Sequence, residues 1–455
     1  MKKNVKLTFL CLLLSFVGLN IISCTSNKAV KQSSTTQQTK LRTMYDYQLM
    51  DKMGDFVFKK HTKLPLIIDK QGRPCLEVTL QNGNLKQSFI FLIDTGSSDS
   101  FIDSDILKLL DGSRASGYRS NILFAYGNRN IMCPLIYYDL LKTAAFEVEN
   151  VGLFSTDNLD FGCTVDGRPI AGLIGMNILK KCAFRLSVAD NVLEIYDDTT
   201  YEPQGAEINL ILDDAANGLL HGNLKLPENN VVKVKFDTGA YTSIIKEYSY
   251  NKIIKHIQYE LKSTFYDGYN YTYSMLNNCE FYDTKFQDIF IYTDSVCNEN
   301  LVGMQVLRHF DIYVNCEDQN MWLNPRPINA QKKTFSDVAM KGIKILGFSL
   351  AKDKDGAFVN GLMYFEGKPL CEGLNLGDKI LSVNGVSVNE NPITENKKSE
   401  TTTTPETLPD SFDIVVSRSS EENPITVHLV YAPLSYFIDN GLDHTQAVIN
   451  SVLSK

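Results

Sequence analysis

The sequence lacks the features that mark several large classes of protein. Its 455 residues carry 45 Lys and Arg against 53 Asp and Glu, a formal net charge of −8. No run of basic residues is interleaved with aromatic ones, and nucleic-acid binding depends on such basic surfaces. Gly-rich phosphate-binding loops and the Gly-x-Ser-x-Gly turn of many hydrolases are also absent. We therefore expect no nucleic-acid partner.

Metal-binding and redox motifs are missing as well. The 10 cysteines include no Cys-x-x-Cys motif and no His-rich metal spacing, so we expect no metal and no cofactor. Cys11 and Cys24 lie in the N-terminal segment, and the spacing of the other cysteines leaves open whether they are paired or free. Four histidines have no partner at a recognisable hydrolase spacing: His61, His221, His256 and His309.

One long hydrophobic run is present, and it lies at the N-terminus. Basic residues in positions 1–6 precede an almost wholly apolar stretch over 7–22, the order of a secretory signal peptide. The run ends in Ser23-Cys24 and resembles the lipobox of bacterial lipoproteins. That resemblance implies cleavage before Cys24, acylation of Cys24 and attachment to a membrane. An uncleaved signal anchor is the alternative, since about 16 apolar residues are at the short limit for crossing a bilayer.

The rest of the chain is long enough for several domains. Residues 25–43 are polar, with little to bury, which predicts a flexible tether. The body that follows shows short strands separated by turns, typical of an all-β protein. We divide the chain into a signal peptide (1–23), Cys24 with the tether (24–45), a first lobe (46–205), a second lobe (206–328), a small third domain (329–435) and a tail (436–455).

The two lobes contain an internal repeat. Asp94-Thr95-Gly96 corresponds to Asp237-Thr238-Gly239, and Leu173-Ile174-Gly175 corresponds to Leu301-Val302-Gly303. Each Asp follows a hairpin whose second strand is apolar. Two copies of about 130 residues predict two similar halves related by an approximate twofold axis. Asp94 and Asp237 then occupy equivalent positions.

Paired carboxyl groups suit the hydrolysis of a peptide bond by water. Two carboxyls about 3 Å apart cannot both ionise, so they share one proton, and one acts as a base while the other acts as an acid. Gly96 and Gly239 let backbone amides approach the carboxylates, and the hydroxyls of Thr95 and Thr238 can brace the two loops together. The alternative is that Asp and Gly simply form a turn at the end of each strand.

Residues 60–325 resemble the pepsin and retropepsin superfamily of aspartic peptidases. The family motif, an apolar residue followed by Asp-Thr-Gly and Ser or Ala, matches Ile93–Ser97 and Phe236–Ala240. The resemblance implies two β-lobes that form a pseudo-twofold cleft, in which Asp94 and Asp237 activate a water. A proton shared between two carboxyls is established for that family. Viral members use two identical chains, whereas this chain carries both halves.

The two loops differ after the glycine. Ser97 can donate a hydrogen bond to its carboxylate, whereas Ala240 cannot. Since a lost donor to the charged form raises a carboxyl's affinity for its proton, we expect Asp237 to hold its proton more tightly. A pH optimum less acidic than that of a stomach-type enzyme would follow.

A flap that covers the substrate is expected from the same resemblance. Two hairpins place a tyrosine beside a turn-forming glycine, at Tyr126-Gly127 and at Tyr266 with Gly268. Tyr-rich strands are also common in ordinary half-buried sheet, so both assignments stay open.

The third domain resembles a PDZ module. Leu346-Gly347-Phe348 matches the family's carboxylate-binding loop, and Leu376–Ile380 with Val383–Gly385 matches its central signature. The resemblance implies that an extended peptide or a free C-terminus binds as an added strand. Residues 389–410 are polar and contain Pro where the family has its second helix. A domain that only stabilises the lobes is the alternative.

Together these features predict an aspartic endopeptidase tethered to the bacterial envelope, facing the periplasm or the outside. Its partners would be a peptide or protein substrate, a C-terminal peptide ligand and the membrane. The main alternative is a catalytically silent lipoprotein that binds peptides in the same cleft. A maturation protease that cleaves one partner, such as its own chain near residues 330–340, is a third possibility.

Overall fold

The computed structural model describes residues 56–326, 344–387 and 411–433, apart from gaps of which the longest are 111–113, 125–128, 157–163 and 210–217. The predictions for the signal peptide, Cys24, the tether and the tail fall outside these residues, as do Tyr126, Gly127 and Leu346. Strands dominate and the helices are short, so the all-β prediction is confirmed. None of the helices in the described part is long and apolar enough to cross a membrane, and the described cysteines are free thiols.

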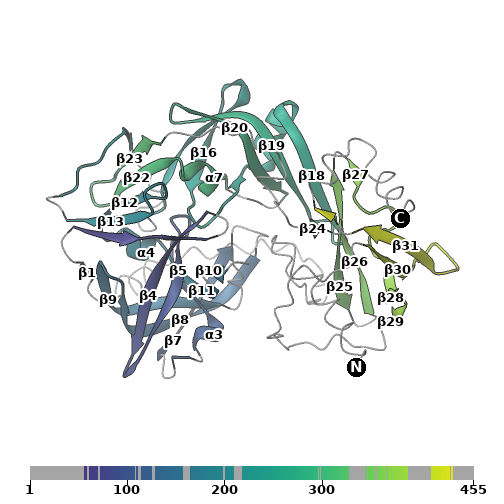
Figure 1. Ribbon diagram of the computed structural model, residues 1–455, viewed down its shortest axis with the longest axis horizontal. Helices are drawn as coiled ribbons and strands as arrows, with labels where there is room; N and C mark the ends of the chain where they lie inside the picture. Colours follow the sequence, from purple (N-terminus) through teal and green to yellow (C-terminus); the bar gives the residue numbers. More distant parts are fainter. Residues whose placement is uncertain are drawn as a thin grey trace, which may run out of the picture. The chain divides into compact units, whose positions relative to one another are not determined.

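The chain separates into two compact units. The larger unit comprises residues 36–256 and 276–331, and the smaller unit comprises residues 257–275 and 332–455. The larger unit contains both copies of the repeat, drawn from purple to green in Figure 1. We describe each unit by itself.

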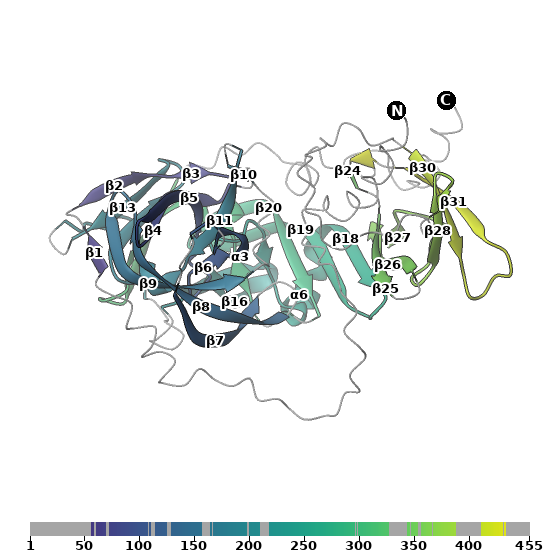
Figure 2. The ribbon, with the colours of Figure 1, turned by 90° about the horizontal axis from the view of Figure 1, so that it is seen from below.

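The first copy forms a closed ring of six strands. Their order is β9-β6-β11-β5-β4-β8, and pairing between β8 and β9 closes the ring. The strands curve round into this ring (Figure 2). They enclose a core that contains Ile90, Phe101 and Phe154. The ring strands are β4 (Pro74–Asn82), β5 (Leu85–Ile93), β6 (Phe101–Asp103), β8 (Arg129–Lys142), β9 (Phe146–Thr156) and β11 (Arg168–Ile174). Beside them lie β1 (Phe56–Phe58), β3 (Ile67–Ile68), α3 (Ser104–Leu107), β7 (Arg114–Phe124) and β10 (Thr164–Val165).

The second copy repeats this order of strands. Its ring is β15-β16-β21-β17-β20-β19, closed where Lys225 of β15 pairs with Glu280 of β19. In both copies the strand before the Asp-Thr-Gly loop runs parallel to the strand of the second motif, with Ile93 opposite Ile174 and Phe236 opposite Val302. The elements are β15 (His221–Leu226), η1 (Pro227–Asn229), β16 (Asn230–Phe236), β17 (Ser243–Ile244), α6 (Glu247–Ile253), η2 (Ile254–His256), β19 (Asn270–Phe281), β20 (Thr284–Asp294) and β21 (Leu301–Val302).

A six-stranded sheet joins the two copies. Its order is β14-β23-β22-β12-β13-β2, and its central pair places Arg185 of the first copy opposite Tyr313 of the second. These two residues lie the same number of positions after their Leu-apolar-Gly motifs. The pairing of equivalent positions is what an approximate twofold axis requires. The elements are β2 (Thr62–Pro65), α4 (Met176–Leu179), β12 (Ala183–Ser187), β13 (Val192–Tyr196), β14 (Ala206–Asn209), α7 (Met304–Leu307), β22 (Phe310–Asn315) and β23 (Asn320–Pro325).

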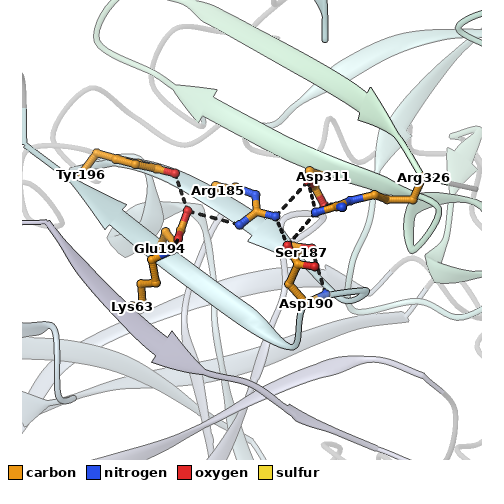
Figure 3. Close-up of polar contacts among 8 residues, drawn as sticks. All are labelled: Lys63, Arg185, Ser187, Asp190, Glu194, Tyr196, Asp311 and Arg326. Carbon is orange, nitrogen blue, oxygen red and sulfur yellow. Dashed lines mark hydrogen bonds and ion pairs between the residues drawn. The ribbon is translucent and has the colours of Figure 1, made fainter. Parts of the chain in front are cut away.

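An ion-pair network on this sheet also links the copies (Figure 3). The guanidinium of Arg185, on β12, lies 2.9 Å from the Asp311 carboxylate on β22 and 3.3 Å from Glu194 on β13. Arg326 approaches both Asp311 and Asp190 at 2.6 Å. The network borders a polar pocket of about 370 Å³. A buried charge that loses its partner is strongly destabilising, so the network holds the two copies in register.

We predict that Asp311→Asn lowers the free energy of unfolding by about 3–5 kcal/mol, because it leaves the buried Arg185 without its main partner. Urea unfolding at pH 7 measures the change. Lys63→Met is the matched control, since Lys63 pairs with Glu194 in the same network but its side chain is 66% exposed and such pairs contribute about 0–1 kcal/mol. Equal losses in the two variants would contradict the prediction.

The smaller unit has its own sheet and core. The order is β18-β26-β28-β30-β31, with β25 paired to β26, and its core includes Val359, Ile380, Ile414 and Val416. The elements are β18 (Ile257–Phe265), β24 (Lys344–Ile345), β25 (Phe348–Asp353), β26 (Gly356–Phe365), β27 (Lys368–Pro369), β28 (Lys379–Val383), β29 (Val386–Ser387), β30 (Ser411–Ser417), β31 (Ile425–Val430) and β32 (Ala432–Pro433).

One hairpin departs from the expected domain boundary. We assigned the whole of 206–328 to the second lobe, but residues 257–275 group with the smaller unit. There β18 pairs antiparallel with β26, from Leu261 opposite Phe365 to Phe265 opposite Gly361. The hairpin thus adds a strand to the sheet of the third domain, a pairing between segments far apart in the sequence.

Candidate functional site

The two Asp-Thr-Gly loops have the same backbone setting. Asp94 follows β5, and its N–H donates to the carbonyl of Ile174 at 2.9 Å. Asp237 follows β16, and its N–H donates to the carbonyl of Val302 at 3.0 Å. In each copy the apolar-apolar-Gly strand therefore runs directly beside the loop that carries the aspartate.

The buried threonines bind the loops to each other. The N–H of Thr95 donates to Thr238 Oγ1 at 3.0 Å, and the N–H of Thr238 donates to Thr95 Oγ1 at 3.2 Å. The hydroxyl of Thr95 donates to the carbonyl of Phe236 at 2.9 Å, and that of Thr238 donates to the carbonyl of Ile93 at 2.7 Å. These four reciprocal hydrogen bonds hold the two loops together.

Thr95→Val keeps the shape of the side chain but removes one donor and one acceptor from this set. We expect it to lower the free energy of unfolding by about 2–4 kcal/mol, because the buried Thr238 N–H and Phe236 carbonyl each lose a partner. Chemical denaturation measures the loss. Thr79→Val is the control: Thr79 lies on β4, and its hydroxyl forms an exposed hydrogen bond with Ser88 on β5, so its effect should be within about 0.5 kcal/mol.

Each carboxyl faces the glycine of the opposite loop. A Cβ atom built on Gly96 would lie 2.7 Å from Asp237 Oδ1, and one built on Gly239 would lie 2.6 Å from Asp94 Oδ2. Side chains other than hydrogen at these positions would collide with the carboxyls. The backbone also holds each carboxyl, because Gly96 N–H donates to Asp94 Oδ1 and Ala240 N–H donates to Asp237 Oδ1, both at 2.9 Å.

The two carboxyls interact strongly. Burial and the neighbouring charge of Asp237 raise the pKa of Asp94 from 3.8 to about 8, and a hydrogen bond between the two side chains adds to the increase. The charge of Lys235 and the N–H of Gly96 act in the opposite direction on this pKa. At neutral pH the pair therefore retains one proton, which is the state that acid–base catalysis by two carboxyls requires.

This proton makes stability depend on pH. A carboxyl whose pKa rises on folding contributes stability that is complete below its unfolded pKa and is lost as the pH rises through its folded pKa. For Asp94 the window runs from 3.8 to about 8. We predict that Asp94→Asn, which binds no such proton, becomes more stable relative to the wild type as the pH rises through this window.

Urea unfolding at several pH values would measure the difference. Asp283→Asn is a suitable control, because it makes the same chemical change at an exposed carboxyl in a turn. A constant difference between wild type and Asp94→Asn across the window would show that the pair does not hold the proton.

The expected role of Ser97 is wrong. Its hydroxyl donates to the carbonyl of Asp99 at 2.8 Å and not to the Asp94 carboxylate, because a nearby backbone acceptor competes for its single hydrogen. The difference between Ser97 and Ala240 therefore does not distinguish the two carboxyls. The raised pKa falls on Asp94, in the loop that carries the serine.

Sequence reasoning missed two serines that support the loops. Ser100 Oγ accepts the N–H of Gly175 at 2.9 Å, and Ser243 Oγ accepts the N–H of Gly303 at 3.2 Å. Both lie at the same position of the repeat, six residues after the aspartate. That shared position was the available signal, because an identical polar residue in two copies is unexpected at a buried site.

A buried lysine was missed as well. Lys235 lies two residues before Asp237, where the first copy has Leu92. Its ammonium lies 2.8 Å from Glu299 Oε2. Burial by itself would lower the pKa of Lys235, but the charges of Asp237, Glu299 and Asp94 raise it overall. A charged residue two positions before the aspartate, where the first copy has the apolar Leu92, was the visible signal.

Of the flap candidates, Tyr266 and Gly268 lie at the turn of the hairpin in the smaller unit. Gly268 has φ +85°, a conformation that favours glycine. The N–H of Tyr266 donates to the carbonyl of Asn360 at 2.7 Å, and its ring contacts Phe358. This turn is bound to β26, and the assignment of a flap stays a prediction.

The loop before β25 and the start of that strand contain two of the residues for which we expect a peptide-binding role, Gly347 and Phe348. Gly347 is buried with φ +75°, and its carbonyl accepts the N–H of Met363 at 2.8 Å. Phe348 points into the core of the smaller unit, so its side chain has a structural role. Among the described strands, β25 pairs with β26 alone.

Comparison with protein families identifies this part of the chain. Residues 337–408 match the PDZ domain family. The chain contains a PDZ domain. Strands β30 and β31 lie beyond the matched residues, but they continue the PDZ sheet through β28. A search of curated proteins finds no match to the sequence.

The described residues contain no group of His, Cys, Asp and Glu side chains that could hold a metal ion. The candidate site therefore consists of the Asp94–Asp237 pair with its threonines and glycines, together with Lys235 and Glu299. The PDZ domain forms a second, separate candidate for peptide binding.

Proposed function

We propose that the larger unit is an aspartic-type endopeptidase with the pepsin-like arrangement of two lobes. The observation that carries this proposal is the pair of carboxyls on equivalent loops, braced by the threonines and retaining one proton near neutral pH. Keeping two like charges together is costly without a role for them. Reciprocal bonding of both loops fixes the geometry that the reaction needs.

In the proposed reaction a water lies between the two carboxyls. The ionised Asp237 accepts a proton from the water, and the resulting oxygen nucleophile attacks the carbonyl carbon of the scissile peptide bond. The protonated Asp94 donates its proton to the carbonyl oxygen, so that a neutral diol forms. Collapse of the diol then breaks the C–N bond: the ionised Asp94 takes a proton from a diol hydroxyl, and Asp237 gives the proton it took from the water to the leaving amine.

The PDZ domain supports a role in recognising protein substrates. PDZ domains bind an extended peptide or a C-terminus as a strand added to a sheet edge, and β25 is the strand that follows the Gly347 loop. The apolar N-terminal run followed by Ser23-Cys24 supports a lipid anchor. We propose that the protein acts at the bacterial envelope, on peptides or proteins outside the inner membrane.

A catalytically silent peptide-binding lipoprotein is the second candidate. The PDZ match favours it, because peptide binding needs no catalysis. A statine-type transition-state mimic distinguishes the two candidates. An assembled pair of carboxyls should bind the mimic and raise the melting temperature, whereas a silent cleft need not bind it.

We predict that residues 25–455 cleave a mixed peptide library between pH 3 and 8, with an optimum far less acidic than pH 2. Activity should fall as the pH rises towards the pKa of Asp94, about 8, because the protonated acid is then lost. Asp94→Asn and Asp237→Asn should each abolish cleavage, measured by mass spectrometry of the products. Asp283→Asn should leave the cleavage pattern unchanged, and identical patterns from wild type and Asp94→Asn would exclude the proposed mechanism.

A further inference from the structure

Lys235 and Asp237 lie on the same face of the chain segment that ends β16. Side chains two residues apart in a strand point to the same side, and Phe236 between them points into the core. The Lys235 side chain is only 8% exposed. At the equivalent position of the first copy, Leu92 is buried and apolar. The duplication thus places a cation beside one aspartate and a hydrocarbon beside the other.

The surrounding backbone fixes the lysine and its partner. Lys235 N–H donates to the carbonyl of Asn300 at 3.0 Å, and Asn300 Nδ2 donates to the carbonyl of Lys233 at 3.1 Å. These bonds hold the segment that carries Glu299 against β16. The Lys235 ammonium can therefore contact Glu299 while its charge acts on the two aspartates.

The charges that face Lys235 come from every neighbouring element. Asp237 lies on the same segment, Glu299 on the segment before β21, Asp94 on the first loop and His221 directly opposite on β15. The charge of Asp237 acts on Lys235 more strongly than that of Asp94. Glu299 is 54% exposed at its side chain and also experiences the charge of Lys246.

An ion pair between Lys235 and Glu299 with only a structural role would not require a buried ammonium beside the two aspartates. A buried ammonium is costly unless it is well paired, and Glu299, its direct ion-pair partner among the described residues, is half exposed to water. The ionised member of the carboxyl pair supplies the remaining negative charge. Since the charge of Asp237 acts on Lys235 more strongly than that of Asp94, this arrangement favours the negative charge on Asp237 and leaves the proton on Asp94.

We propose that Lys235 is a positioning residue that favours the singly ionised Asp94–Asp237 pair and assigns the negative charge to Asp237. It makes two equivalent loops chemically different, one the base and the other the acid. Glu299 moderates this effect by neutralising part of the lysine charge. The inference rests on the proposed function, but it concerns the ionisation of the carboxyls and can be tested without catalysis.

The test uses three variants that should shift the pH–activity profile upward, downward and not at all. Removing a positive charge raises both pKa values of the pair, so Lys235→Met should move both limbs of the pH–activity profile upward by about one pH unit. Glu299→Gln removes a negative charge and should move both limbs downward. Lys235→Arg keeps the charge and should restore the wild-type limbs. A purely structural lysine would change stability and leave the limbs in place.

A second measurement separates this inference from the proposed function. Carbon-13 NMR of aspartate-labelled full-length protein follows the carboxyl titration directly, and Asp94→Asn assigns the signals. If the wild type cleaves no peptide, the endopeptidase proposal fails, yet the titration still decides the role of Lys235. Upward shifts in Lys235→Met with downward shifts in Glu299→Gln support the inference, and unchanged titration overturns it. Should Lys235→Met fail to fold, Glu299→Gln alone decides in the same way.

Discussion

The reciprocal hydrogen bonds between Thr95 and Thr238 are the constraint on which the rest of the site depends. Two like charges repel, so two aspartates remain face to face only if the backbone beneath them is fixed. The threonines use both their hydroxyls and their amides for this purpose. The threonine of each loop therefore has its hydrogen-bond partners only when the other loop is in place. The shared proton, the raised pKa of Asp94 and the proposed chemistry all follow from that closeness.

The two copies share one set of structural contacts and differ in what surrounds them. The strand rings, the Ser100 and Ser243 supports and the central Arg185–Tyr313 pairing are common to both. The hairpin of β18 and β19 has a counterpart in β7 and β8 of the first copy, but only β18 pairs with the PDZ strand β26. A duplicated scaffold thus carries different attachments on its two halves. The same divergence places Lys235 beside only one of the two aspartates.

Some predictions from sequence were incorrect for identifiable physical reasons. Ser97 was expected to bond a carboxylate, but a carbonyl two residues away captured its hydroxyl. Tyr266 was one of two open candidates for a flap, and its backbone bonds Asn360 of the PDZ sheet, a partner that the spacing did not indicate. The sequence did identify Ser97 as a hydrogen-bond donor and Tyr266 as a residue beside a turn. The choice among several possible partners depends on distances that composition and spacing do not contain.

The sequence by itself determined the all-β class, the repeat, the equivalence of Asp94 and Asp237 and the PDZ signature. These features are local, because strand periodicity, turn residues and repeated motifs can each be seen within short segments. Only the tertiary structure decided which groups meet across the chain: the exchange of hydrogen bonds between the threonines, the pairing of Lys235 with Glu299 and the pairing of β18 with β26. Such contacts are selected by the three-dimensional path of the backbone, which brings together residues that no spacing rule connects.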